Sequence, residues 1–229
     1  MAENSVSTIT TLTSTGNMES DSSESMDVEA QQEHYLYIAM ELCESGTLEA
    51  WMKRNPKRSQ EESIMMFQEI CCGVNYIHKK KHIHRDLKPS NIYLTKDRHV
   101  KIGDFGLATN IGKTRAVVAP VGQEPEAHAS GQTCGVGTPL YMAPEQHSGK
   151  LCDEKVDIYS LGLIFLELLV HFETLAERQD VLRKINEEIY IPPFERRVLN
   201  VLRQMVKKNP QERPSAKVVL IHLETRATR

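Results

Sequence analysis

The chain lacks four features that would each assign it to a particular class of protein. Its formal net charge is only −3 over 229 residues, so composition gives no argument for wholesale binding to nucleic acid or membranes. Its five cysteines are an odd number without the paired spacing of a metal site, which favours free thiols in a reducing compartment. Its longest apolar run, residues 156–170, is too short to span a bilayer and contains Asp157 and Glu167. The N-terminus does not have the pattern of a signal peptide.

The chain does have enough apolar residues, 40%, for the core of one globular domain with a tail. Residues 1–34 are rich in Ser, Thr, Asp and Glu and poor in large apolar groups, so they cannot bury enough surface to offset the entropy of ordering. We expect this segment to be disordered. A passive solvated segment is the favoured interpretation, and a phosphorylatable regulatory tail is the alternative.

One stretch, residues 82–108, concentrates polar residues on two loops that flank a predicted strand hairpin. Residues 93–94 and 100–102 follow the strand period of two, with a turn at 97–98. Because both loops leave the same end of the hairpin, a proton acceptor and metal ligands can face one small volume. Phosphoryl transfer needs such an arrangement, since the protein mainly positions the reactants and neutralises charge. The polar residues concerned are Asp86, Lys88, Asn91 and Asp104.

The two loops contain a pair of motifs in a fixed order. The sequence HRD at 84–86 is followed by Asn91, and DFG at 104–106 comes after the hairpin. Either motif alone can recur by chance as an unrelated acidic turn. Both together, with the hairpin between them, match the signature of the protein kinases, and the chain therefore resembles a eukaryotic protein kinase.

This resemblance implies a role for each polar residue. Asp86 would accept or orient the proton of the substrate hydroxyl, and Lys88 would lie near the transferred phosphoryl group, as is typical of Ser/Thr kinases. Asn91 would complete the catalytic loop and, with Asp104, hold Mg²⁺, while ATP would be the phosphate donor. These roles suit a hard cation that shares oxygen ligands with phosphates.

The resemblance also implies an adenine site near the beginning of the domain. Residues 35–40, YLYIAM, have the aromatic and β-branched content of a strand, which would be the last strand of the small lobe. Backbone groups of Glu41 and Cys43 would then hold the adenine ring, and Met40 would guard the back of its pocket. Without the later motifs, the same residues are a plain edge strand and turn.

Residues 104–145 correspond to the kinase activation segment. The part from 110 to 137 contains several Pro and Gly residues and is longer than ordinary connections, which indicates an insertion, and the sequence GTPLYMAPE closes it. Arg85 would pair with a phosphate on this loop through charge-assisted hydrogen bonds. Thr133 is the first candidate acceptor and Thr138 the second, and the alternative for Thr133 is an ordinary exposed threonine.

Further helices follow from apolar periodicity, and one of them is apolar almost all round. We expect this helix, 156–170, in the centre of the domain. The resemblance makes its Asp157 a structural residue that hydrogen-bonds the backbone of the catalytic loop. It also pairs Arg213 with Glu145 in the interior, where losing either member costs roughly 3 to 5 kcal/mol. The other helices are expected at 46–52, 60–78, 174–187, 195–207 and 215–225.

Several segments narrow the resemblance within the kinases. The sequences YLYIAMELCESGTLEAWM, HRDLKPSNIYL, VGTPLYMAPEQ and VDIYSLGLIFLELL resemble the kinases of the α subunit of translation initiation factor 2. The endoplasmic-reticulum-stress member is the most similar, and the haem-regulated, amino-acid-starvation and double-stranded-RNA members are close to it. The subfamily implies this protein substrate, control of translation under stress, and substrate docking by a helix with Thr174 and Arg178. A second kinase chain is left open as a partner, and direct nucleic-acid binding by this segment is not expected. The location would be the cytoplasm or the cytosolic side of a membrane-anchored parent.

The expected fold class is α+β, a truncated kinase domain over 35–225. A mainly helical large lobe would occupy 44–225, with a remnant of the small-lobe sheet and the hinge at 35–43. The 229 residues contain no Gly-rich loop, no lysine in a VAIK-like strand and no helix with its glutamate partner. Both the phosphate lid and the Lys–Glu pair are needed for activity, so we expect little kinase activity and weak ATP affinity from this chain alone.

Two functions therefore stay open. The first is a Ser/Thr kinase of the initiation-factor type seen as an incomplete product, which the intact HRD and DFG residues favour. The second is a catalytically dead lobe that binds and competes for substrate or for partner kinases, which the missing lysine favours.

Overall fold

The structure is a computed structural model that describes residues 41–110, 138–147, 152–185 and 194–224. The chain divides into two units, residues 1–42 and 43–229, and every element described below belongs to the second. The tail and the strand expected before residue 41 lie outside the described residues, as does nearly all of the predicted insertion in the activation segment.

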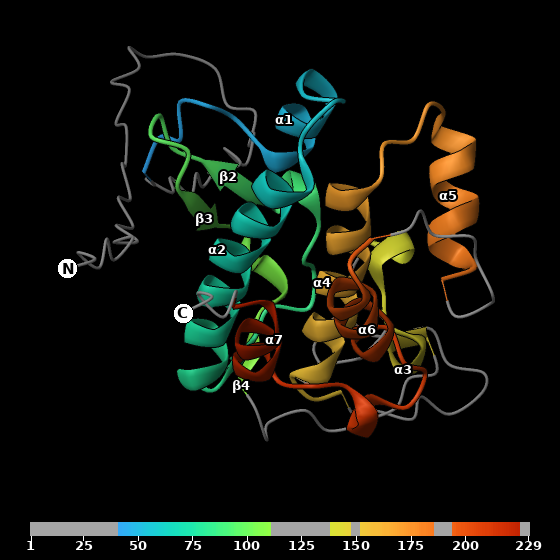
Figure 1. The fold of residues 1–229 in the computed structure, drawn as a ribbon. Coiled ribbons are helices and arrows are strands. Elements are labelled where there is room, and N and C mark those ends of the chain that lie inside the picture. The colour runs from blue at the N-terminus through green and yellow to red at the C-terminus, as the bar shows by residue number, and fades with distance from the viewer. Residues whose placement is uncertain (1–40, 111–137, 148–151, 186–193, 225–229) are drawn as a thin grey trace, which may run out of the picture. The chain divides into compact units, whose positions relative to one another are not determined.

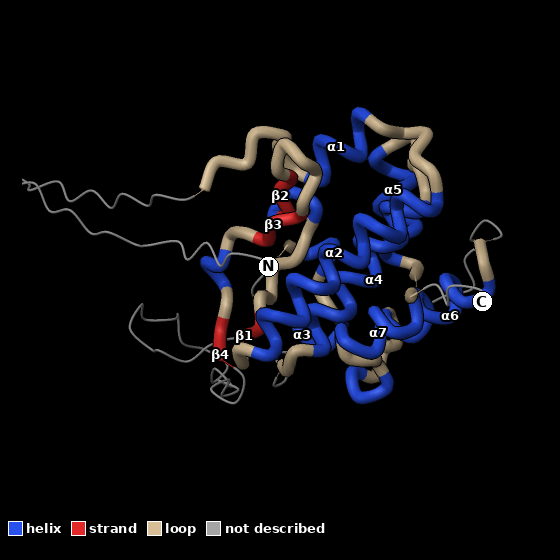
Figure 2. Tube along the Cα trace, turned by 60° about the vertical axis from the view of Figure 1, so that its left-hand side comes forward, coloured by secondary structure: helices blue, strands red, loops and turns tan. Residues whose placement is uncertain are grey.

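The second unit is mainly helical and has two small antiparallel sheets (Figures 1 and 2). This agrees with the predicted α+β class. The helices are α1 (Leu48–Arg54), α2 (Gln60–Lys79), α3 (Pro144–His147), α4 (Lys155–Leu169), α5 (Leu175–Arg183), α6 (Arg196–Met205) and α7 (Ala216–Leu223). The strands are β1 (His82–Ile83), β2 (Ile92–Leu94), β3 (Val100–Ile102) and β4 (Thr109–Asn110). Single 3₁₀ turns are η1 (Pro89–Asn91), η2 (Phe105–Leu107), η3 (Pro139–Tyr141) and η4 (Pro210–Glu212).

Helix α4 forms the centre of this unit. Every residue from Val156 to Leu168 is buried, as predicted for a helix that is apolar almost all round. Helix α2 packs along it, and the rings of Phe67 and Phe165 stack with centroids 4.0 Å apart and an interplanar angle of 11°. Helix α6 packs against α4, and α7 against α2 (Figure 1). The core therefore surrounds α4 and holds it in place.

The C-terminal end of α4 is closed by side chains from around the start of α2. Arg58 donates to the carbonyl oxygens of Glu167, Leu168 and Val170, with Nε 2.7 Å from the Leu168 oxygen and Nη2 3.0 Å from the Val170 oxygen. The Ser63 hydroxyl donates to the same Leu168 oxygen at 2.7 Å. A cation here satisfies the last carbonyl groups and suits the negative end of the helix dipole.

Four helices begin after a side chain that accepts a hydrogen bond from the first turn, namely Thr47, Ser59, Thr174 and Ser215. The helix predicted at 46–52 starts later than expected. Gly46 has a φ of 78°, in the left-handed region, and α1 begins at Leu48 after its N-cap. Helix α5 ends at Arg183, earlier than predicted.

Strands β2 and β3 form the predicted hairpin, in which Ile92 lies opposite Ile102 and Leu94 opposite Val100. Strands β1 and β4 form a second antiparallel pair. This pair was not predicted, because strands of two residues are too short to show a periodic pattern. Within the described ranges, no helix combines the length and the apolar character needed to cross a bilayer.

Candidate active site

The β2–β3 hairpin brings the two polar loops to one end, as the sequence predicts. The pairing of Ile92 with Ile102 places Asn91 opposite Gly103, and the Gly103 N–H donates to the Asn91 carbonyl oxygen at 3.0 Å. His84 Nε2 lies 3.0 Å from the Gly103 carbonyl oxygen. The backbone of one glycine therefore ties the DFG loop to the HRD loop.

The Asp86 carboxylate accepts hydrogen bonds at both oxygens. Its Oδ2 accepts from Lys88 Nζ at 2.8 Å and from Asn91 Nδ2 at 3.1 Å. Its Oδ1 accepts from the amide and from the hydroxyl of Thr138, both at 2.9 Å. Lys88 Nζ also donates to Thr138 Oγ1 at 2.7 Å, so ammonium, carboxylate and hydroxyl close one cluster. Thr138 was predicted only as a second phosphate acceptor, and that role stays a prediction.

The electrostatics of this cluster favour the charged form of Asp86. Burial acts to raise the pKa of its carboxyl, but the hydrogen bonds from Lys88 and Thr138 and the Lys88 charge outweigh it and lower the pKa. Asp86 is therefore ionised near neutral pH, and its donors fix its orientation. A carboxylate held in this way can accept or orient the proton of a hydroxyl placed against it.

Asn91 and Asp104 are the residues predicted to hold Mg²⁺. Asn91 Nδ2 donates to the Asp86 carbonyl at 3.0 Å as well as to its carboxylate, which leaves the amide oxygen to act as a ligand. Asp104 precedes η2 with an exposed side chain and a φ of 61°. Among the described residues, no three His, Cys, Asp or Glu side chains gather to hold a metal. An amide and a carboxylate fit Mg²⁺ that takes its remaining ligands from phosphates and water.

Asp157 holds the catalytic loop from the first turn of α4. Its carboxylate accepts from the backbone N–H groups of His84 at 2.9 Å and Arg85 at 2.8 Å, and His78 Nε2 lies 2.8 Å from Oδ2. Arg85 has a φ of 68°, a conformation that costs a non-glycine residue on the order of 1 to 3 kcal/mol. The buried carboxylate holds the loop in that conformation, so its geometry suits the structural role predicted for Asp157.

The Arg85 side chain has a buried nitrogen that finds no partner in the described part of the chain. Its Nε donates to the Leu107 carbonyl oxygen at 2.6 Å, but Nη1 is buried with no hydrogen-bond acceptor among the described residues. A buried guanidinium nitrogen in this condition favours an anion nearby. The predicted anion is a phosphate on Thr133, which lies outside the described residues.

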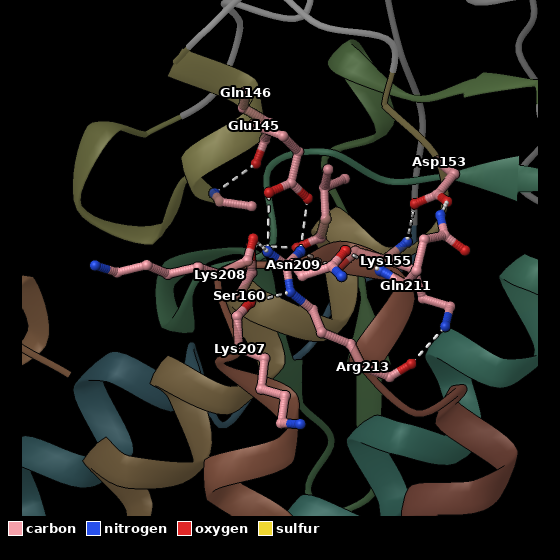
Figure 3. Close-up of polar contacts among 12 residues, drawn as sticks. Glu145, Gln146, Asp153, Lys155, Ser160, Lys207, Lys208, Asn209, Gln211 and Arg213 are labelled. Carbon is pink, nitrogen blue, oxygen red and sulfur yellow. Dashed lines mark hydrogen bonds and ion pairs between the residues drawn. The ribbon is translucent and has the colours of Figure 1, made fainter. Parts of the chain in front are cut away.

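Glu145 and Arg213 form a buried, bidentate ion pair (Figure 3). Arg213 Nη1 donates to Glu145 Oε1 at 2.6 Å and Nη2 to Oε2 at 2.8 Å. The guanidinium also donates to the carbonyl oxygens of Lys155, Lys207 and Lys208. The pair joins the end of the activation segment to the C-terminal helices, and we assign it no chemistry.

Sequence reasoning missed a cluster in which Arg178, partly exposed, meets the buried Tyr141 and Glu167. Arg178 Nε donates to Glu167 Oε1 at 2.8 Å and Nη2 to Oε2 at 3.2 Å. The Tyr141 hydroxyl donates to Glu167 Oε1 at 2.9 Å and accepts from Arg178 Nη2. Burial raises the pKa of both Glu167 and Tyr141. The three residues come from η3, α4 and α5, so no local pattern could have found them.

This cluster bears on the residues that were predicted to dock the substrate. Arg178 lines the groove beside Lys88 and Thr138 with a side chain that is 22% exposed, and its guanidinium pairs with the buried Glu167. The Thr174 hydroxyl oxygen caps α5 by accepting from the Glu177 N–H at 3.1 Å. Both side chains therefore have intramolecular partners, and their docking role stays a prediction.

A groove of about 780 Å³ adjoins the Asp86 cluster. Lys88 and Thr138 line it, as do Gln179 and Arg183 of α5. Its volume lies within the range of ordinary ligand sites, so it can accept a few residues of an extended substrate.

The predicted adenine-site residues lie near the boundary between the two units. Met40 is outside the described residues, and Glu41 is exposed. The carbonyl oxygen of Cys43 accepts from the Gly46 N–H at 3.3 Å in a tight turn. Their role in binding adenine stays a prediction.

Comparison with known proteins shows to which family this chain is similar. A model of the protein kinase domain matches residues 23–223. Similar curated proteins include the interferon-induced, double-stranded RNA-activated protein kinase of Rattus norvegicus, 39% identical over 191 residues. Eukaryotic translation initiation factor 2-alpha kinase 3 of Rattus norvegicus is 40% identical over 191 residues, and eIF-2-alpha kinase GCN2 of Mus musculus is 39% identical over 212 residues.

These alignments cover most of this chain but little of the relatives. They take in 81%, 80% and 84% of the chain, and 34%, 17% and 13% of the three relatives in the same order. The chain thus spans about a third or less of their lengths. The predicted resemblance to this group of kinases is confirmed. Because the matched region takes in the catalytic loop, the hairpin and the activation segment alike, the chain belongs to the protein kinase family.

Proposed function

We propose that this domain belongs to a serine/threonine kinase that transfers the γ-phosphate of ATP to a serine of the α subunit of translation initiation factor 2. The transfer would lower translation under stress. Two relatives are named for this substrate. The observation that carries the kinase chemistry is the set of hydrogen bonds that holds the Asp86 carboxylate from Lys88, Asn91 and Thr138.

In this proposal Asp86 accepts or orients the proton of the substrate serine. Its two oxygens are already fixed by their donors, so little reorganisation is needed when the hydroxyl arrives. Lys88 Nζ lies 2.8 Å from the Asp86 carboxylate. From this position the ammonium group would balance negative charge on the transferred phosphoryl group. The groove lined by Lys88 and Thr138 would present the serine to this pair.

Asn91 and Asp104 would hold Mg²⁺ together with the phosphates of ATP, and the backbone of Glu41 and Cys43 would hold the adenine with Met40 behind it. When bound, Mg²⁺ would neutralise charge on the phosphates. Phosphorylation of Thr133, or of Thr138, would supply the anion for Arg85.

Helix α5 would dock the protein substrate. Thr174 and Arg178 already have partners within the chain. Arg178 also lines the groove, and exposed neighbours on α5 would extend the contact. Leu175 is 63% exposed, and Gln179 lines the groove. The variant Leu175→Ser should slow phosphorylation of the α subunit and spare a short generic peptide. Equal loss on both substrates would reject docking by α5.

The test of the kinase proposal compares the 229-residue chain with the product of the complete transcript. Each is incubated with Mg-ATP and purified α subunit, and mass spectrometry locates any phosphoserine. A complete product with a Gly-rich loop and a VAIK-like lysine should phosphorylate the subunit, and its Asp86→Asn variant should not. A stop codon directly before Met1, with no transfer by the chain, would defeat the enzyme proposal.

A second candidate is a binding module that competes for the α subunit or for a partner kinase. It concerns the 229 residues by themselves, which contain neither a Gly-rich loop nor a VAIK-like lysine. Such a module would bind the subunit in calorimetry without modifying it, and would slow its phosphorylation by an active relative. Absence of binding would exclude this function.

A further inference from the structure

A continuous set of hydrogen bonds joins α5 to Asp86 through one tyrosine. Arg178 Nη2, on α5, donates to the Tyr141 hydroxyl. The Tyr141 N–H donates to the Thr138 carbonyl oxygen at 2.9 Å across η3. The Thr138 amide and hydroxyl then donate to Asp86 Oδ1, each at 2.9 Å. Arg178, which was predicted to contact the substrate, is thus connected through Tyr141 and Thr138 to Asp86, the proposed proton acceptor.

The central residue of this set has little freedom to move. Tyr141 is only 5% exposed, and Glu167 beneath it is 3% exposed. The Tyr141 hydroxyl lies between Arg178 and Glu167, and the Tyr141 backbone carbonyl oxygen accepts from the Ser160 hydroxyl at 2.8 Å. Hydrogen bonds to charged groups in a buried setting are the strong ones. A displacement of α5 would therefore move Tyr141 or break one of these bonds.

We propose that Arg178 is a positioning residue, which fixes Tyr141 and η3 and thereby the two hydrogen bonds from Thr138 to Asp86. A protein that binds α5 would then alter the geometry at Asp86 through Arg178, so that docking and catalysis are coupled. The inference rests on the proposed function only for the catalytic role of Asp86. It gives Arg178 an inward role in addition to its place in the lining of the groove.

The competing explanation is that Arg178 and Glu167 form an ion pair that only stabilises the fold. The two explanations predict that loss of Arg178 speeds amide hydrogen exchange in different parts of the domain. A structural pair would stabilise the whole domain, so its loss would speed exchange of protected amide hydrogens throughout the core. A positioning residue would act on η3 first. The Thr138 and Tyr141 amides report on η3, because both donate hydrogen bonds within the set.

The test is amide hydrogen exchange, measured by NMR on the 229-residue chain and its variants. In Tyr141→Phe the Arg178–Glu167 pair is kept and only the hydroxyl is lost. We expect exchange at the Thr138 and Tyr141 amides to become about tenfold faster or more, as for loss of one hydrogen bond to a charged group. Amides in the middle of α2 should keep their rates. Arg178→Met should show the same local increase, and Arg178→Lys a smaller one.

Arg183→Met is the matched control, because Arg183 lies on the same helix, is exposed and has no partner among the described residues. It should leave both η3 amides unchanged. Unchanged exchange at Thr138 in Tyr141→Phe would overturn the proposal, and so would an equal increase across α2. If Arg178→Met does not fold, Tyr141→Phe decides alone. No phosphate transfer enters this measurement, so its failure is distinct from failure of the kinase proposal.

Discussion

Removal of the Arg213 guanidinium should destabilise the domain severely. Its side chain is 0% exposed, and it donates two hydrogen bonds to Glu145 and three to the carbonyl oxygens of Lys155, Lys207 and Lys208. Breaking a buried pair by removing one partner costs about 3 to 5 kcal/mol, because the other charge stays in the interior. A typical domain has about 5 to 15 kcal/mol in total, so Arg213→Met should remove about a fifth or more of the stability.

Urea unfolding followed by circular dichroism measures this loss, with Arg203→Met as control. Arg203 is exposed on α6 and has no partner among the described residues, so its loss should change the free energy of unfolding by less than about 0.5 kcal/mol. Combining Arg213→Met with Glu145→Leu should recover part of the stability, since no charge is then left buried. The reasoning is refuted if Arg213→Met costs under about 1 kcal/mol, or if the double variant is no more stable than the single one.

Three further predictions concern other parts of the domain. Asp86 has a lowered pKa, so it stabilises the domain at pH values above the ordinary carboxyl pKa, and this contribution is lost as the pH falls through the lower folded-state pKa. Lys88→Met should therefore weaken the dependence of the unfolding free energy on pH, measured by urea titrations at several acidic pH values. The same dependence on pH in both proteins would contradict this. Arg58→Met removes donors to three carbonyl oxygens at the end of α4 and should cost about 2 kcal/mol, whereas a loss within error would show that water replaces it. The 229-residue chain should bind Mg-ATP weakly in calorimetry, because it lacks the Gly-rich loop and the VAIK-like lysine, and tight binding would show this expectation to be wrong.

Elements with a local pattern were predictable from the sequence. The apolar run at 156–170 is α4, and the alternation around the turn at 97–98 is the β2–β3 hairpin. Cys71 is buried and Cys72 exposed, as expected for neighbours on a helix that point in different directions. The placement of Asn91 beside Gly103 followed from the hairpin, because its two ends must meet.

Contacts between distant parts of the chain were not predictable in this way. Arg58 closes α4 from 109 to 112 positions away, and Thr138 reaches Asp86 across 52 positions. Periodicity carries no information about either, since each depends on how folded elements meet. Arg178 shows the consequence: an exposed-looking arginine on a polar helix is held by Glu167 from the interior.

The two ends of α4 serve the two halves of the site, and the helix sets the distance between them. Asp157, in its first turn, holds the catalytic loop, and Glu167, near its last turn, holds Arg178 of α5. Ten residues of α-helix separate them by about 15 Å. Because α4 is packed on every side and close-packed interiors transmit strain, this spacing cannot adjust locally. Tyr159, near the start of α4, lines the groove beside Lys88 and Thr138. A core substitution further along α4, at Leu163 for example, should therefore disturb the geometry at Asp86 and at Arg178 together, although Leu163 does not line that groove.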